Sequence, residues 1–431
     1  MNAGKIESVL VLSPESPYPL HGGGQYRTAS LIHYFARFAQ VDLVLISESG
    51  KPALLPPGLV RSQKVIALPR HGKGVLERYA RNARRAIRRV PPLIDRLSGL
   101  SEEIKEAIGN ERYDLGVIEH FWLAPYLDDM QAACDEVALD LHNVESMLHH
   151  RCAQAGTGLI AAGHKRFAVA SKELEAKLLP RFSTVLATSA TDLDAAHAVA
   201  PGAKVVVYPN SLPGTAVEAD SDADAGRVAD TDPGVVVFSG NFEYHPNIDA
   251  ARFLLDAIWP LVHQQVPGLR LRFVGRGDSH IRQFLPSGMG VEVTGPIENA
   301  REEIARAHLV VAPLRAGSGT RIKILEAWSA GKAVVATPMA AEGLAAEDGF
   351  NIVLAATAEA FADSILRLLA DPSAMKMVGG NGKRTFDTRY TWEAAWASLD
   401  PIYHRAKADC PGSPDCGAQV ARPAELSRYT G

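Results

Sequence analysis

The sequence has few cysteines and no long uninterrupted apolar segment. Only four cysteines occur in 431 residues, which excludes the dense disulfide framework of small secreted domains, and we expect reduced thiols. No stretch reaches the roughly 18 uncharged apolar residues of a transmembrane helix. The first residues, MNAGKIESVLVLSP, lack the apolar core of a signal peptide. We therefore expect a cytoplasmic protein.

Net charge is also nearly absent. The chain carries 45 Lys and Arg against 49 Asp and Glu, a formal charge of −4. This balance argues against nucleic acid as a partner, and any site for an anion must be local. What the chain does have is length and apolar content. With 431 residues, 47% of them hydrophobic, it exceeds one ordinary domain and is able to bury two cores.

Short β-branched and apolar runs alternate with longer stretches of helical periodicity. The predicted strands of the first half lie at 9–12, 41–46, 64–68, 114–118, 137–141, 184–187 and 204–208. Those of the second half lie at 235–239, 270–275, 291–294, 309–312, 333–337 and 352–355. Continuous apolar runs are typical of parallel strands buried on both faces. The pattern predicts an α/β fold with two Rossmann-like, doubly wound domains facing a central cleft.

Composition divides the chain into five segments. The predicted segments are an N-terminal domain (1–215), an acidic linker (216–233), a C-terminal domain (234–387), a C-terminal helical segment (388–408) and a disordered tail (409–431). The linker, AVEADSDADAGRVADTDP, is acidic and has no periodicity. Within the fourth segment, 391–406 has aromatic residues at helical spacing, so we expect one amphipathic helix that packs back toward the first domain.

The most informative segment is a glycine-rich turn between a strand and a helix, in VVAPLRAGSGTRIKILEAWSAGK. Arg321 and Lys323 lie in the first helical turn, where the helix dipole disfavours cations. A bound anion offsets that cost. The free N–H groups of such a turn, together with two cations, describe a phosphate site. The turn residues are Gly317, Ser318, Gly319 and Thr320.

Glu326 lies three residues after Lys323 and shares its helix face. A carboxylate just beyond a diphosphate suits the two hydroxyls of a ribose. Gly240, in the segment FSGNFEYHPN that opens the second domain, joins the donor-binding candidates. The sequence thus predicts a nucleotide-diphosphate site in the C-terminal half.

The first domain has its own candidates at the ends of predicted strands. Gly22, Gly23 and Gly24 follow the first strand and open a helix, which allows a ligand to approach the backbone closely. Arg27 lies near the start of that helix. His142, with Asn143 beside it, and His120 each follow another strand, where doubly wound sheets present ligands.

Two further patterns concern metals and membranes. DxD patterns at 192–194, 222–224 and 230–232 lie in a predicted helix and in the linker, so we predict no metal site and no cofactor. The stretch 70–89 is a basic amphipathic helix, suited to an anionic membrane surface or a phosphorylated acceptor. It favours a peripheral position at the inner face of the membrane.

Taken together, these segments resemble the retaining glycosyltransferases of family 4, the group 1 glycosyltransferases with the GT-B fold. The motifs that carry the resemblance are GSGTRIK, YPNSLPG at 208–214, FVGRG at 273–277, HGGGQYR and LDLHNVES. The resemblance covers residues 8 to 405, approximately.

The resemblance implies transfer of a sugar from a UDP- or GDP-linked donor, with retention and without a metal. The acceptor is a polysaccharide, a lipid-linked glycan or a natural product, held on the side of the first domain. His142 then contacts the donor sugar, and the loop 22–24 contacts the donor diphosphate or the acceptor. The family places a glutamate where this sequence has Ser318. Two alternatives stay open: a UDP-sugar epimerase or hydrolase of the same fold, and an inactive nucleotide-binding partner in polysaccharide assembly.

The phosphate assignment predicts the effect of removing either cation. Arg321→Ala and Lys323→Ala should each lose several kcal/mol of transition-state stabilisation, because the leaving diphosphate loses a positive partner. Steady-state kinetics of sugar transfer measure the loss. Unchanged kcat/KM in both variants would contradict the assignment.

Overall fold

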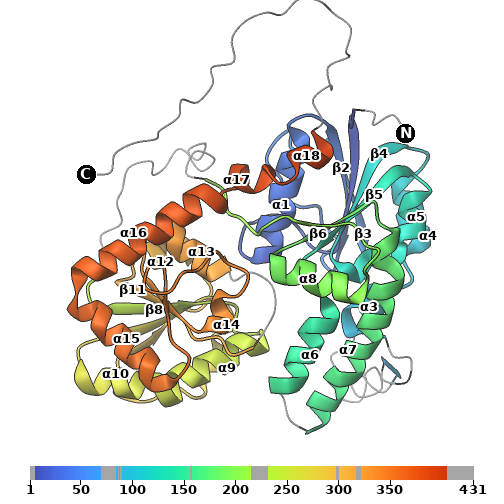
Figure 1. Ribbon diagram of the computed structural model, residues 1–431. Helices are drawn as coiled ribbons and strands as arrows, with labels where there is room; N and C mark the ends of the chain where they lie inside the picture. Colours follow the sequence, from blue (N-terminus) through green and yellow to red (C-terminus); the bar gives the residue numbers. More distant parts are fainter. Residues whose placement is uncertain are drawn as a thin grey trace, which may run out of the picture.

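The computed structural model describes residues 5–68, 84–85, 87, 90–155, 158–214, 232–297, 300–316 and 322–404, arranged as two α/β domains (Figure 1). Several predicted features lie outside these residues. They are the turn 317–320 with Arg321, most of the basic stretch 70–89, most of the linker 216–233, and the tail 409–431.

The first domain is built on a seven-stranded sheet with the order β3-β2-β1-β4-β5-β6-β7, in which every pairing is parallel. Its strands are β1 (Ser8–Ser13), β2 (Gln40–Ser47), β3 (Ser62–Ala67), β4 (Tyr113–Glu119), β5 (Cys134–Leu141), β6 (Thr184–Ala187) and β7 (Val205–Val207). All seven were predicted from their apolar runs. The strand order reverses between β1 and β4, which is where such sheets bind ligands.

Both faces of this sheet are covered. On β1, Val9 and Val11 pack in one core cluster, whereas Leu10 and Leu12 pack in another. Alternate residues of a strand point to opposite faces, so an all-apolar strand needs a helical layer on each side. The helices of this domain are α1 (Gly23–Ala36), α3 (Pro92–Arg96), α4 (Ser101–Ile108), η1 (Phe121–Tyr126), α5 (Leu127–Gln131), α6 (Glu145–Ala155), α7 (Gly158–Leu178), η2 (Leu179–Arg181) and α8 (Ala190–Val199). Of these, α6 and α7 pack on each other and extend away from the sheet (Figure 1).

The second domain repeats the plan with a six-stranded parallel sheet in the order β10-β9-β8-β11-β12-β13. Its strands are β8 (Val235–Ser239), β9 (Arg270–Val274), β10 (Val291–Val293), β11 (Leu309–Ala312), β12 (Val334–Ala336) and β13 (Val353–Leu354). Its helices are α9 (His245–Phe253), η4 (Leu254–Ile258), α10 (Trp259–Gln265), α11 (Ser279–Arg282), α12 (Ala300–Arg306), α13 (Ile322–Ser329), α14 (Pro338–Ala341), α15 (Ala358–Ala370) and α16 (Pro372–Arg389).

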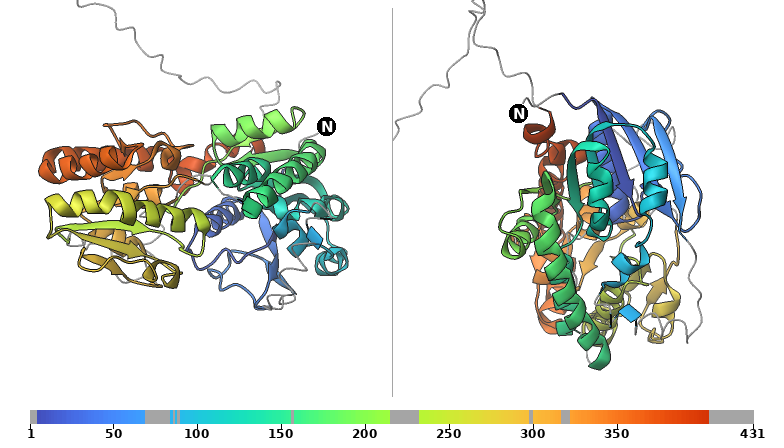
Figure 2. Two further views of the ribbon diagram at one scale, coloured as in Figure 1. Left: turned by 90° about the horizontal axis from the view of Figure 1, so that it is seen from below. Right: turned by 90° about the vertical axis from the view of Figure 1, so that its right-hand side faces the viewer.

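Two segments join the domains at one place. After α16 the chain runs beside Leu212. The Leu212 N–H donates to the Tyr390 carbonyl (2.9 Å), and the Leu212 carbonyl accepts from the Trp392 N–H (3.0 Å). The chain then enters the first domain, where Leu399 and Tyr403 join the core cluster that contains Val9. Figure 2 shows these last helices beside the first domain.

The prediction of one amphipathic helix over 391–406 is wrong. The segment forms two short helices, α17 (Trp392–Trp396) and α18 (Asp400–Tyr403). Thr391 caps the first of them by accepting a hydrogen bond from the Ala394 N–H, and Pro401 stands in the first turn of the second. Proline has no N–H group to donate, so it is favoured at a helix start rather than in the middle of a long helix.

Two smaller points concern the linker and the membrane. Asp232, near the end of the predicted linker, ion-pairs with Arg272 (3.1 Å) and donates its N–H to the Arg306 carbonyl (2.7 Å), so it belongs structurally to the second domain. Among the helices of the described residues, none has both the length and the apolar content needed to cross a bilayer.

The returning segment should contribute directly to the stability of the first domain. Leu399 is 0% exposed, and Leu399→Ala should lower the free energy of unfolding by about 2–5 kcal/mol, because it leaves a cavity. Leu93→Ala is the matched control, since Leu93 is 43% exposed in the same domain. Urea unfolding followed by circular dichroism measures both, and equal small losses would contradict the packing role.

Candidate functional site

The starts of two helices from different domains meet at the domain interface. A Cβ atom added to Gly23, the first residue of α1, would lie 2.9 Å from Cγ1 of Ile322, the first residue of α13. Tyr26, on the same turn of α1, packs in the core cluster of the second domain. Helix N-termini carry partial positive charge, so two of them at one place favour an anion there.

The glycines at the start of α1 also serve internal contacts. A Cβ at Gly24 would lie only 2.0 Å from Oε1 of Glu15, so only glycine lets this carboxylate approach the helix. Burial opposes ionisation of Glu15. The hydrogen bond to His120 and the charges of His120, His142 and Arg276 outweigh burial and lower its pKa. The donor-binding role predicted for Gly22, Gly23 and Gly24 stays a prediction.

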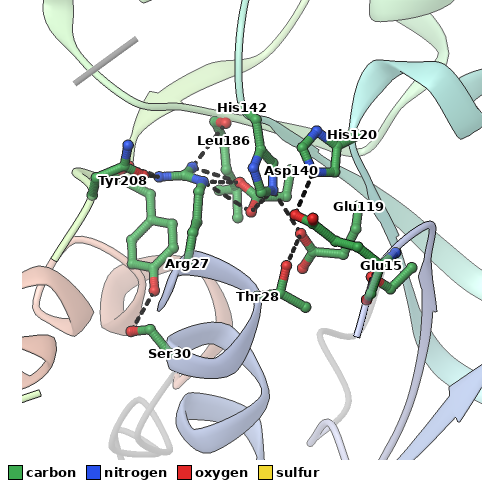
Figure 3. Close-up of polar contacts among 12 residues, drawn as sticks. Glu15, Arg27, Thr28, Ser30, Glu119, His120, Asp140, His142, Leu186 and Tyr208 are labelled. Atoms are coloured by element: carbon green, nitrogen blue, oxygen red, sulfur yellow. Dashed lines mark hydrogen bonds and ion pairs between the residues drawn. The ribbon is translucent and has the colours of Figure 1, made fainter. Parts of the chain in front are cut away.

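Arg27, a secondary candidate for the site, has a buried side chain whose described contacts lie inside the first domain, and its role in binding stays a prediction. Its side chain is 1% exposed and lies between β5, β6 and β7 (Figure 3). Nε donates to both carboxylate oxygens of Asp140 (2.8 and 2.9 Å), and Nη1 donates to the Tyr208 carbonyl (2.6 Å). A buried guanidinium must satisfy its donors with partners inside the protein, so these contacts of Arg27 stabilise the first domain.

The two histidines predicted at strand ends come together. The rings of His120 and His142 stack with centroids 3.5 Å apart, and the indole of Trp122 stacks on the other side of His120 at 4.1 Å. His120 has φ 65° and ψ 140°, a backbone conformation rarely adopted by residues other than glycine. Such strain gathers at functional sites. Asn143 follows His142 in the loop before α6.

Glu119, which we did not predict, lies beneath His142. Its Oε2 is 2.8 Å from His142 Nε2 and accepts a hydrogen bond from the Thr28 hydroxyl at 3.0 Å. Burial, and next the charge of Asp140, raise the pKa of Glu119 well above its usual value. For Asp140, burial acts in the same direction, but the charges of Arg27 and His142 outweigh it and lower the pKa.

These carboxylates form the one metal-like cluster in the described part of the chain. The ligand atoms of Glu119, Asp140 and His142 all lie within 4.8 Å of one another. Arg27 already contacts both carboxylate oxygens of Asp140. A divalent cation would therefore have to approach a guanidinium and compete with it for the same oxygens.

In the second domain, three predicted site residues lie around α13: Lys323, predicted as catalytic, and Gly240 and Glu326, predicted to bind the donor. Lys323 Nζ donates to the Asn247 side chain (2.8 Å) and lies 4.6 Å from the centre of the Phe238 ring. A Cβ at Gly240 would lie 3.2 Å from Lys323 Nζ. Burial raises the pKa of Glu326 to about 7, while Arg301 and Lys323 act in the opposite direction.

Some residues of the site had a signal in the sequence and others had none. Glu119 is the last residue of β4, so the strand-end argument used for His120 applies equally to it. Asn247 and Arg301 lie on α9 and α12, far from the glycine-rich turn in sequence, and only the fold brings them to α13.

Residues 233–371 match the family model described as glycosyl transferases group 1. Over this segment, about a third of its length, the chain is similar to the group 1 glycosyl transferases. The matched residues include α13, Lys323 and Glu326, so the family match covers the glycine-rich segment from which the sequence predicted a donor site.

Solved structures extend the fold around this segment to nearly the whole chain. Sucrose-phosphate synthase from Thermosynechococcus elongatus superposes with a TM-score of 0.69 and 18% identity over 92% of this chain and 98% of that one. HepE from Anabaena, solved with UDP and glucose, gives a TM-score of 0.60, 17% identity and coverage of 92% and 99%. The predicted α/β class and two-domain GT-B architecture are confirmed.

Curated relatives match over shorter lengths. A 44.6 kDa protein in the cps region of Klebsiella pneumoniae, described as uncharacterized, is 23% identical over 172 residues, 38% of this chain. An exopolysaccharide phosphotransferase of Streptomyces coelicolor is 35% identical over 123 residues, 26% of this chain. The aligned parts cover 44% and 13% of these relatives, less than half of either one.

The buried ion pair in the first domain predicts a large effect on stability. Arg27→Met should lower the free energy of unfolding by about 3–5 kcal/mol, because Asp140 is left buried without its partner. Lys105→Met is the control: its ion pair with Glu102 is exposed (side chains 55% and 87%), so its loss should change the free energy of unfolding little. Guanidinium unfolding compares them, and similar losses would contradict the structural role.

Proposed function

We propose that this protein is a glycosyltransferase that moves a sugar from a nucleotide diphosphate-sugar to a glycan acceptor. The observation that carries the proposal is the meeting of the α1 and α13 starts, with Lys323 and Glu326 on α13. In this proposal, Lys323 supplies positive charge for a diphosphate and Glu326 supplies a carboxylate for a ribose. The match to group 1 glycosyl transferases and the UDP found with HepE support the same donor class.

In the proposed reaction, the bond between the anomeric carbon and the diphosphate oxygen breaks and negative charge develops on the leaving group. Lys323, Arg321 and the N–H groups of the turn 317–320 stabilise that charge. Glu326 holds the ribose hydroxyls, and His142 holds the donor sugar from the first domain. The acceptor hydroxyl attacks on the face that the diphosphate leaves and passes its proton to the leaving diphosphate, so the configuration is retained. The cations and N–H groups of the site take the place of a metal.

The proposed acceptor is a glycan under assembly, polymeric or lipid-linked. The relatives from the cps region and the exopolysaccharide phosphotransferase support a role in polysaccharide biosynthesis. The basic stretch 70–89 is proposed to bring the enzyme to the anionic inner face of a membrane. Arg85, one of its described residues, already pairs with Asp95 at 2.7 Å, which ties the end of the stretch to α3.

A thermal-shift screen with UDP, GDP and ADP tests the donor site directly. The correct nucleotide should raise Tm, because it binds only the folded protein. Lys323→Met should abolish the shift, whereas Lys376→Met, which removes an exposed lysine on α16, should preserve it. Failure of all three nucleotides to raise Tm would overturn the proposal. A shift without transfer to any glycan would point instead to an inactive nucleotide-binding partner.

Donor binding should also depend on pH through Glu326. Its pKa of about 7 means that the carboxylate form, the better acceptor for ribose hydroxyls, grows as pH rises from 6 to 8. Affinity for UDP-glucose or GDP-mannose should therefore rise roughly tenfold over this range. Calorimetry at both pH values measures the change. Glu326→Gln should bind the donor more weakly at pH 8, and its affinity should no longer change with pH. If the affinity of this variant still rose with pH, another group would be responsible for the pH dependence.

A further inference from the structure

Glu119 is a fully buried carboxyl group whose main partner is a histidine of the proposed site. It is 0% exposed, and its Oε2 contacts His142 Nε2 at 2.8 Å and the Thr28 hydroxyl at 3.0 Å. Its Oε1 has no hydrogen-bond partner among the described residues. A buried polar atom without a partner destabilises the fold, so packing alone does not explain a glutamate at position 119.

The contacts of His142 determine which ring nitrogen carries hydrogen. Nε2 faces two carboxylates, Glu119 at 2.8 Å and Asp140 Oδ2 at 3.3 Å. Asp140 is kept ionised by Arg27, so at least one of the two facing groups is an obligate acceptor. Because the ionised Asp140 can only accept, Nε2 is favoured as the N–H donor. The neutral ring then carries its hydrogen on Nε2 and leaves the lone pair on Nδ1.

Nδ1 is the nitrogen that remains available to a ligand. No hydrogen bond joins it to a described residue. It is also absent from the fully buried, unpartnered side-chain atoms, which do include Glu119 Oε1. Nδ1 therefore keeps access to solvent. Through the stacked ring of His120, which lies 3.6 Å from a Cβ placed on Gly24, His142 is connected to the start of α1 at the domain interface.

We propose that Glu119 is a positioning residue that fixes the ring of His142 through Nε2, so that Nδ1 accepts a hydrogen bond from a hydroxyl of the donor sugar. The inference rests on the proposed function for the identity of the sugar, but the orientation of the ring follows from the contacts alone. The ion pair of Asp140 and Arg27 lies next to the ring of His142 (Figure 3). This assignment gives the buried, partly unpaired carboxyl group a role that packing does not.

The tautomer of His142 is measurable without any substrate. The full chain, labelled with ¹⁵N-histidine, is examined by long-range ¹H–¹⁵N NMR at pH 8, and His142→Gln identifies the signals of His142. We expect the Nε2–H form in the wild type and in Glu119→Gln, whose amide oxygen still accepts from Nε2. Glu119→Ala leaves only the 3.3 Å contact to Asp140, so a measurable fraction of the Nδ1–H form should appear.

Kinetics then separate positioning from folding. Glu119→Ala should lower kcat by up to about 100-fold, the scale of a misplaced group at a reacting centre, while Glu119→Gln should recover most of it. Glu175→Ala is the matched control. Glu175 is also 0% exposed in the first domain and contacts Ser146 instead of His142. If a thermal melt shows that Glu175→Ala is folded, this variant should leave the NMR signals of His142 and kcat unchanged.

The outcomes distinguish the two proposals. A dominant Nδ1–H form in the wild type, or equal effects of Glu119→Ala and Glu175→Ala on His142, overturns the positioning role even in an active enzyme. An Nε2–H form that depends on Glu119, in a protein that transfers no sugar from any nucleotide donor, supports the ring geometry and overturns the proposed function. If Glu119→Ala fails to fold, the tautomer of His142 in the wild type and in Glu119→Gln tests the positioning role instead. A dominant Nδ1–H form in either protein contradicts it.

Discussion

The buried charge of Arg27 is the constraint on which the first half of the molecule depends. A guanidinium with 1% exposure must find partners for all its donors. It finds them on Asp140 at the end of β5, on the Leu186 carbonyl of β6 and on the Tyr208 carbonyl just after β7. One side chain of α1 thus ties together the carboxyl ends of three strands, and removing any of these partners would leave a charge in an apolar core.

This arrangement also sets the electrostatics at the domain interface. Because Arg27 neutralises Asp140, the pair adds little net charge around His142 and Glu119. Glu15 supplies negative charge on the first domain, while Arg276, Arg301 and Lys323 supply positive charge on the second. Charges of both signs therefore lie close to this interface.

Sequence alone predicted the fold more completely than the site. All thirteen strands were found from apolar runs, because buried parallel strands have a strong local signal. Lys323 and Glu326 were predicted because helix starts have a local signal too, and their binding role stays a prediction. The buried contacts of Arg27 were not predicted, because its partners lie more than 100 residues away. The single helix predicted over 391–406 was wrong because the prediction relied on the spacing of aromatic residues. Thr391 and Pro401 each start a separate short helix, and those starts depend on where the chain turns.

The return of the chain into the first domain has a consequence for synthesis. Leu399 and Tyr403 complete a core whose strands begin at Ser8. During translation the first domain emerges from the ribosome early, yet part of its hydrophobic core arrives only after the entire second domain. Until then apolar side chains of α1 such as Phe35, whose ring contacts Tyr403, lack part of their packing. The two domains are thus not independent folding units, and neither half of the gene encodes a complete one.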